Sequence, residues 1–216
     1  MSRFNSYARK VDEIAKQAFE EYRKAEKELK RAQDAANATP QRMGVVDPQY
    51  AARYARAQAD LAEAKNAHAV AKHRLAARKS DILAIKKELQ QDISNYYTAD
   101  PAQIDGATLE LLKSGILKPH EYSKLMNDAT KAGNHTMARM IGKYADSAAA
   151  EVAKRDGENS TTARELRVVG YQAQQNNGGD RLEAFQVMEQ LYDRCVNNPG
   201  MIDYWEQFTA ETVADF

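Results

Sequence analysis

Residues 4–36 read FNSYARKVDEIAKQAFEEYRKAEKELKRAQDAA, and small or apolar residues recur along them at alternating steps of four and three positions. Residues 50–96 read YAARYARAQADLAEAKNAHAVAKHRLAARKSDILAIKKELQQDISNY and repeat the same steps from the first tyrosine to the last. A mean spacing of 3.5 residues keeps one side of a helix against one partner while the two helices supercoil. Both stretches are therefore predicted to be coiled-coil helices.

The segment between the two stretches, residues 37–47, contains helix-breaking residues, among them Pro40. Asp47 can then cap a new helix, with Pro48 at its first position. A loop of this length lets the two helices fold back on each other, and in the antiparallel pairing large seam residues mostly face small ones. We expect an antiparallel coiled-coil hairpin over residues 1–97 with its loop at 37–47; the alternative is a long parallel dimer.

The heptad pattern stops at residue 98, and shorter amphipathic patterns replace it. Each is bounded by a capping residue, a proline or a glycine, which is typical of short helices. Patterns typical of strands are almost absent. Residues 98–216 are predicted to form a small helical bundle. The expected fold class is all-α: a long antiparallel coiled-coil hairpin followed by a small helical bundle.

Charge is divided unevenly along the 216 residues, although the formal net charge is zero. Residues 1–97 contain 19 Lys and Arg against 13 Asp and Glu, whereas residues 98–216 contain 12 against 18. Halves of opposite sign attract each other, within a molecule or between copies. Charged residues make up 29% of the chain and the mean hydropathy is -0.72, which favours an elongated protein with much surface over a compact enzyme.

The cellular compartment is indicated by the single cysteine and the absence of long apolar stretches. Cys195 has no partner for a disulfide within the chain, which is typical of a reducing compartment. No signal peptide is evident, and no window approaches the roughly 20 apolar residues of a membrane-spanning helix. We expect a cytoplasmic protein without a membrane partner.

Catalytic chemistry is not indicated by any motif. The four histidines and Cys195 do not cluster with carboxylates at metal-binding spacings, and no glycine-rich phosphate loop follows a strand. We therefore expect no catalytic residue, metal site, cofactor or small-molecule substrate, and we predict that the chain is not an enzyme.

One stretch of the second helix is strongly basic, with Asp81 as its only acidic residue. A basic helix can neutralise phosphates, so nucleic-acid binding is one interpretation. A solvated face, or a face that meets the acidic half of the chain, is the other. The candidate nucleic-acid-binding residues are Lys72, Arg74, Arg78, Lys79, Lys86 and Lys87.

Two apolar groups are candidate contacts for a protein partner. One lies in the predicted loop, and the other alternates with acidic residues after Arg194, the last basic residue. An acidic amphipathic helix can close the bundle, dock in a groove of a partner, or bind the basic hairpin of a second copy. The candidate partner-binding residues are Met43, Val45, Val46, Tyr204, Trp205, Phe208 and Phe216.

Two further segments resemble a group of viral proteins. Residues 106–122 read GATLELLKSGILKPHEY and residues 137–145 read MARMIGKYA. Together they are similar to short helical segments in small uncharacterised proteins of tailed-phage genomes, often among head-assembly genes. The resemblance implies a role in phage assembly, in the host cytoplasm or the virion. Phage scaffolding proteins often end in a basic helix, whereas this chain ends in an acidic one.

These observations predict a non-enzymatic helical interaction or assembly protein, a phage structural or morphogenesis factor, that acts through a coiled-coil arm and an acidic C-terminal helix. A protein partner or self-association is expected. The alternatives are a nucleic-acid-binding protein that uses the basic face of residues 72–87, or an inhibitor that binds a host enzyme or defence complex.

Overall fold

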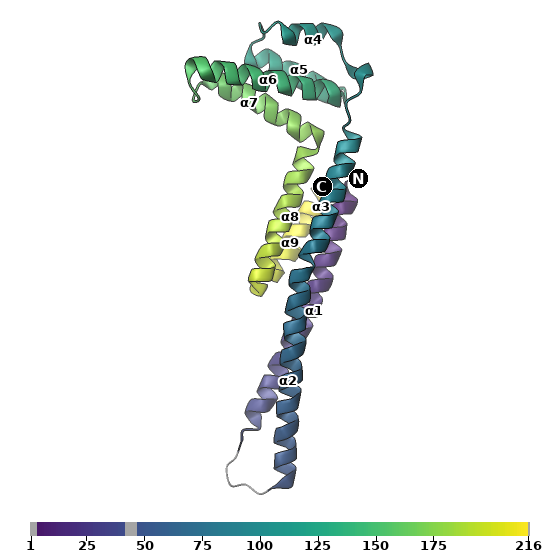
Figure 1. Cartoon of the computed structure of the whole chain (residues 1–216), viewed down its shortest axis with the longest axis vertical. Helices are drawn as coiled ribbons and strands as arrows, with labels where there is room; N and C mark the ends of the chain where they lie inside the picture. The colour runs from purple at the N-terminus through teal and green to yellow at the C-terminus, as the bar shows by residue number, and fades with distance from the viewer. Residues whose placement is uncertain (1–3, 42–46, 216) are drawn as a thin grey trace. The chain divides into compact units, whose positions relative to one another are not determined.

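The computed structural model describes residues 4–41 and 47–215, and it describes side chains as far as residue 209. Every regular element in these residues is a helix, so the predicted all-α class is confirmed. The helices form two compact units: a first unit of Met1–Lys87 with Val187–Phe216, and a second unit of Glu88–Gln186 (Figure 1). The sequence indicates a single boundary near residue 98. In the structure, the C-terminal segment Val187–Phe216 belongs to the first unit.

The first unit is built on an antiparallel pair of long helices, α1 (Asn5–Ala38) and α2 (Pro48–Ala77). Near the loop, the Tyr50 hydroxyl donates to the Pro40 carbonyl at 2.6 Å. Farther along, the Tyr22 and His68 rings lie 5.2 Å apart, centroid to centroid. The predicted cap is present, because Asp47 Oδ1 accepts a hydrogen bond from the Gln49 backbone N–H at 2.9 Å.

The second heptad stretch is interrupted once, at Arg78. Helix α2 ends at Ala77 and α3 (Lys79–Tyr96) begins two residues later, where the sequence predicts one helix over 48–97. The Leu75 carbonyl, one turn before α3, accepts a hydrogen bond from the Tyr192 hydroxyl at 2.7 Å, in a buried position. Arg78 itself is exposed, although the heptad places it on the seam, whereas Leu75 before it and Ile82 after it on the seam are buried.

A third layer in the first unit comes from the end of the chain. It consists of the last part of α8 (Asp180–Asn197), the short turn η3 (Pro199–Met201) and α9 (Ile202–Asp215). Helix α9 packs against α1. The centre of this contact is a group of three rings, in which Phe19 lies 5.6 Å from Tyr192 and 5.7 Å from Trp205, centroid to centroid.

The second unit contains the end of α3, four further helices and the beginning of α8. Most residues of its apolar core belong to the helices at residues 135–156 and 161–174. The elements are η1 (Pro101–Gln103), α4 (Gly106–Lys113), α5 (Pro119–Lys131), α6 (His135–Asp156), α7 (Thr161–Gln174) and the turn η2 (Gln175–Gly179). Gly178 lies in that turn with φ +89°, a backbone conformation that favours glycine and separates α7 from α8.

Helices α6 and α7 approach each other closely because glycine stands at their crossing. A Cβ atom on Gly142 would lie 2.3 Å from the Ala173 Cβ, and a Cβ on Gly170 would lie 1.9 Å from Asp146 Oδ1. Real Cβ atoms do not come this close to other atoms. The small residues therefore set the distance between the two helices, and Asp146 is held over the α7 backbone.

Candidate functional site

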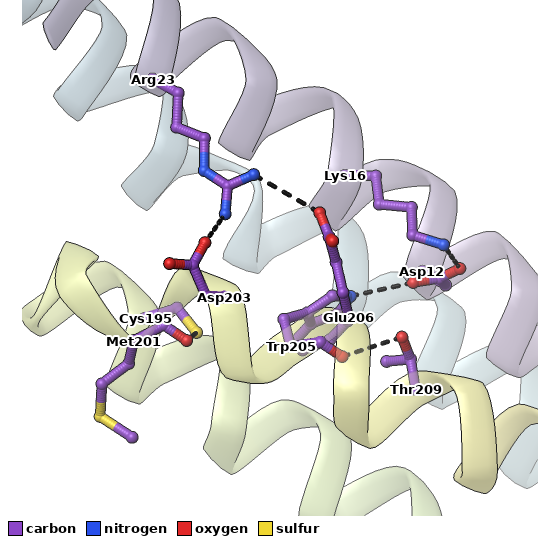
Figure 2. A network of polar contacts seen from close by, with 9 residues as sticks. All are labelled: Asp12, Lys16, Arg23, Cys195, Met201, Asp203, Trp205, Glu206 and Thr209. Atoms are coloured by element: carbon purple, nitrogen blue, oxygen red, sulfur yellow. Dashed lines mark hydrogen bonds and ion pairs between the residues drawn. The ribbon is translucent and has the colours of Figure 1, made fainter.

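Helix α9 is attached to α1 by a polar network that surrounds one buried indole (Figure 2). The Trp205 side chain is completely buried, and its Nε1–H donates to Asp12 Oδ1 at 2.9 Å. The other oxygen of Asp12 accepts a hydrogen bond from Lys16 Nζ at 2.7 Å. Both carboxylate oxygens of Asp12 are therefore used, and the one polar atom of the indole has a partner, as burial of a tryptophan requires.

Ion pairs reinforce the same contact at its exposed rim. The Arg23 guanidinium contacts the carboxylates of Asp203 and Glu206, the second at 3.4 Å (Figure 2). All three side chains remain open to water, so each pair is expected to contribute less than about 1 kcal/mol. The buried rings, rather than these pairs, hold α9 in place. Asp203 and Glu206 of α9 therefore meet a basic residue of the hairpin, as the charge division along the sequence suggested.

The predicted partner-binding residues fall into three groups. Trp205 lies in the core of the first unit and is not presented on the surface. Tyr204 is 59% exposed and Phe208 is half-buried, so both are accessible on α9. The other members, Met43, Val45, Val46 and Phe216, lie outside the described residues.

Two of the predicted nucleic-acid-binding residues form ion pairs with the last part of α8. Lys79 Nζ lies 2.6 Å from Asp193 Oδ2, and Lys86 Nζ lies 2.6 Å from Glu189 Oε2. The hydrogen bond to Asp193 raises the pKa of Lys79. These two lysines join the hairpin to its third layer, and their charges are already compensated.

Two further members pair within the hairpin. Arg74 lies 3.8 Å from Glu21 on α1, and Arg78 lies 3.0 Å from Asp81, which is the only acidic residue of the basic stretch. Lys72 and Lys87 are exposed and have no carboxylate within ion-pair distance among the described residues. Less positive charge is therefore available to a phosphate backbone than the sequence pattern indicates.

The part of the hairpin near its loop has no third layer among the described residues. We call it the distal arm, residues 24–38 of α1 and 48–70 of α2. Only Ala36 is buried in this part of α1, and α2 has no buried residue before Ala71. The half-buried seam residues are Ala25, Leu29, Ala32, Tyr50, Tyr54, Ala57, Leu61, Ala64 and His68.

An open cleft of about 810 Å³ lies in the second unit. We call it the cleft: residues 93–97 at the end of α3 form one side, 139–150 of α6 another, and 170–182 of α7, η2 and early α8 the third. Its apolar lining includes Ile93 and Leu182. This volume is within the range of about 300–1,000 Å³ that small-molecule sites occupy.

Three charged side chains of α6 line the cleft. Arg139 Nη1 donates to the Tyr97 carbonyl at 2.9 Å, which connects α6 to the end of α3. Lys143 follows one turn later and has no carboxylate partner within 4.0 Å among the described residues. Asp146 lies against Gly170, and partial burial raises the pKa of its carboxyl.

The sequence interpretation did not single out the cleft, although part of the signal was present. Arg139, Lys143, Asp146 and Ala150 recur at steps of four, three and four, which places them on one side of α6. This stripe is separate from the apolar stripe that enters the core. Which elements lie opposite it depends on contacts between residues far apart in the chain, and no local pattern contains that information.

The described residues contain no group of three or more His, Cys, Asp or Glu side chains placed to hold a metal ion. Within the same part of the chain, no helix has the length and the apolar character needed to cross a membrane.

No protein-family model, curated protein or solved structure matches this chain.

Proposed function

We propose that this chain is a non-enzymatic helical interaction protein that binds a helix of another protein along its distal arm. The observation that supports the proposal is the difference in burial along one hairpin. The heptad pattern is continuous, yet the seam is buried where the third layer packs and only half-buried along residues 24–35 and 48–70. The distal arm thus presents apolar seam residues that are only half-buried before a partner binds.

The residue types of the distal arm suit an additional helix. Four of its half-buried seam residues are alanines, and small side chains allow a neighbouring helix to approach closely. Leu29 and Leu61 are also half-buried, and each offers a partner helix a larger apolar side chain than the alanines do. An amphipathic helix laid along this surface would bury what the two-helix pair leaves half-exposed, which is a common way of recognising helical partners.

The C-terminal helix supports this function by fixing the base of the arm. Trp205, Asp12 and Lys16 lock α9 on α1, and Lys79 and Lys86 pair with α8. A hairpin that is three layers thick at one end and two at the other can hold its arm rigidly. Rigidity reduces the entropy that a partner loses on binding.

The setting that we propose is assembly of a tailed phage, on the basis of the resemblance in residues 106–122 and 137–145. Genes for a terminase, portal or capsid protein next to the gene for this chain would support that setting. A neighbourhood of unrelated cellular genes would contradict it without affecting the proposed mode of binding.

Site-specific photo-crosslinking tests the proposal on the intact chain. Benzoylphenylalanine is placed at Gln58, an exposed position on the distal arm, and in a control variant at Asn127, an exposed position on α5. The proposal predicts crosslinks from Gln58 to one defined protein in lysate of the encoding organism, and none from Asn127; crosslinks to a second copy alone would contradict it. Light scattering separates the two occupants. A strict monomer without crosslinks from Gln58 would contradict the proposal.

A further inference from the structure

We propose that the cleft of the second unit binds a small organic anion with an aromatic or aliphatic body, the negative group lying between Arg139 and Lys143. This is a binding site separate from the distal arm, and its ligand is of another class. Pockets for small molecules combine a mainly apolar lining with a few convergent polar groups. The cleft has that composition and a volume of about 810 Å³.

The head-group site consists of two cations one turn apart on α6. The hydrogen bond from Arg139 to the Tyr97 carbonyl uses one of the five N–H groups of the guanidinium and holds the planar guanidinium group in position. The remaining N–H groups can bind a carboxylate, sulfonate or phosphate in two-pronged fashion. Lys143, at position i+4, has no carboxylate partner among the described residues and adds a second positive charge on the same side of the helix.

The body of the ligand would lie deeper along the same cleft. Ile93 of α3, Leu182 of α8 and Ala173 of α7 line it with apolar side chains. Such a lining suits an apolar body next to the charged head group.

The charge of Asp146 makes it possible to tell an anion site from a cation site. Its carboxylate lies on the same stripe of α6, one turn beyond Lys143, and would repel an anion in the cleft while attracting a cation. Neutralising Lys143 and neutralising Asp146 should therefore change anion affinity in opposite directions. A ligand of positive charge would reverse both effects.

The experiment compares two probes with similar bodies and opposite charge, 2-naphthoate and 2-naphthylmethylammonium, on the full chain by titration calorimetry and by ligand-observed NMR. Lys143→Gln should weaken 2-naphthoate binding about tenfold, the size of a lost charge-assisted hydrogen bond. Asp146→Asn should strengthen it about twofold or more. Lys154→Gln, an exposed lysine of α6 outside the cleft, is the matched control and should leave the affinity unchanged.

Three results would overturn the inference. The first is an absence of 2-naphthoate binding at millimolar concentration. The second is preferential binding of 2-naphthylmethylammonium, weakened by Asp146→Asn. The third is equal affinity in Lys143→Gln and Lys154→Gln, which would mean that the probe binds elsewhere. Each of these leaves the crosslinks from Gln58 unaffected, so a failure here is distinguishable from a failure of the distal-arm proposal.

Discussion

The two ends of the hairpin have the same sequence pattern and different environments. Toward its amino terminus, the α1 seam is closed to water, with Ala8, Val11 and Ala15 all 0% exposed. Beyond Tyr22, α1 has no buried residue until Ala36, although the steps of four and three continue unchanged. A heptad therefore specifies which side of a helix meets its partner, but it does not specify how completely that side is removed from water.

The third layer accounts for the difference. An alanine-rich pair of helices has few bulky side chains to fill the space beside its seam, so water reaches the seam edge. Trp205 and Tyr192 supply the missing volume at one end of the hairpin, where both are at most 1% exposed. Protein interiors are close-packed. We therefore expect most of the stability of the first unit to come from the side chains that fill this space.

The largest expected effect is the loss of the indole that anchors α9. Trp205→Ala should lower the free energy of unfolding of the first unit by about 3–5 kcal/mol, because it leaves a large cavity beside Phe19 and removes the hydrogen bond from the indole to Asp12 Oδ1. Urea denaturation followed by circular dichroism measures the change. Tyr204→Ala, which removes a 59% exposed ring from the same helix, should change stability by less than about 0.5 kcal/mol.

A matched pair of leucines compares the two ends directly. Leu75 is 0% exposed and Leu61 is half-buried, so Leu75→Ala should cost about 3 kcal/mol and Leu61→Ala about 1 kcal/mol. Both values come from the same urea titrations. Equal losses would mean that the distal seam is buried in solution. A midpoint that rises with protein concentration would then identify a second copy as the cover.

The pairing of the hairpin could be predicted because its signals are local. The heptad steps, the break at Pro40 and the Asp47 cap with Pro48 each depend on a few adjacent residues, and the structure contains the corresponding helices and cap. The pattern of shorter helices after residue 98 was readable for the same reason.

The charge division suggested that the acidic half meets the basic hairpin, but the particular residues of the third layer and of the cleft could not be predicted, because they depend on contacts between residues far apart in the chain. Trp205 meets Asp12 across 193 positions, and Tyr192 meets Leu75 across 117. An amphipathic helix with a buried tryptophan has the same sequence pattern whether it packs on the bundle, on the hairpin or on a partner. The long second helix that the sequence predicts is present as α2 and α3, which follow each other through Arg78 with helical backbone angles (φ -62°, ψ -15°).

The hydroxyl of Tyr192 gives the next prediction. Tyr192→Phe removes the hydrogen bond to the Leu75 carbonyl and leaves a buried acceptor without this partner. We expect a loss of about 2 kcal/mol in urea denaturation. The control is Tyr50→Phe, which removes a hydrogen bond to Pro40 in an exposed position where water can replace it, and which should cost less than about 0.5 kcal/mol. Similar losses in both variants would contradict the difference between the two ends.

The smallest effect is a loss of stability at alkaline pH. Burial raises the pKa of the Cys195 thiol from its ordinary value of 9.0 to about 11. The folded state therefore keeps the thiol proton over a range in which the unfolded state releases it. Stability should fall as pH rises from 9 to 11, and the part due to this thiol should be about 1.4 kcal/mol at pH 10. Urea midpoints measured between pH 7 and pH 10 give the slope.

Moving the thiol to the distal arm tests whether burial of Cys195 causes the decrease of stability with pH. In Cys195→Ala the decline between pH 9 and pH 10 should be smaller, and the remainder reflects groups such as Tyr192, whose pKa burial also raises. Adding Ala64→Cys places a thiol in the half-buried distal seam, where desolvation is weaker. Its alkylation rate should therefore rise with pH as for an ordinary cysteine. If this new thiol stays protonated up to pH 11, the distal seam is as dry as the end beneath α9, and the distinction between the two ends does not hold.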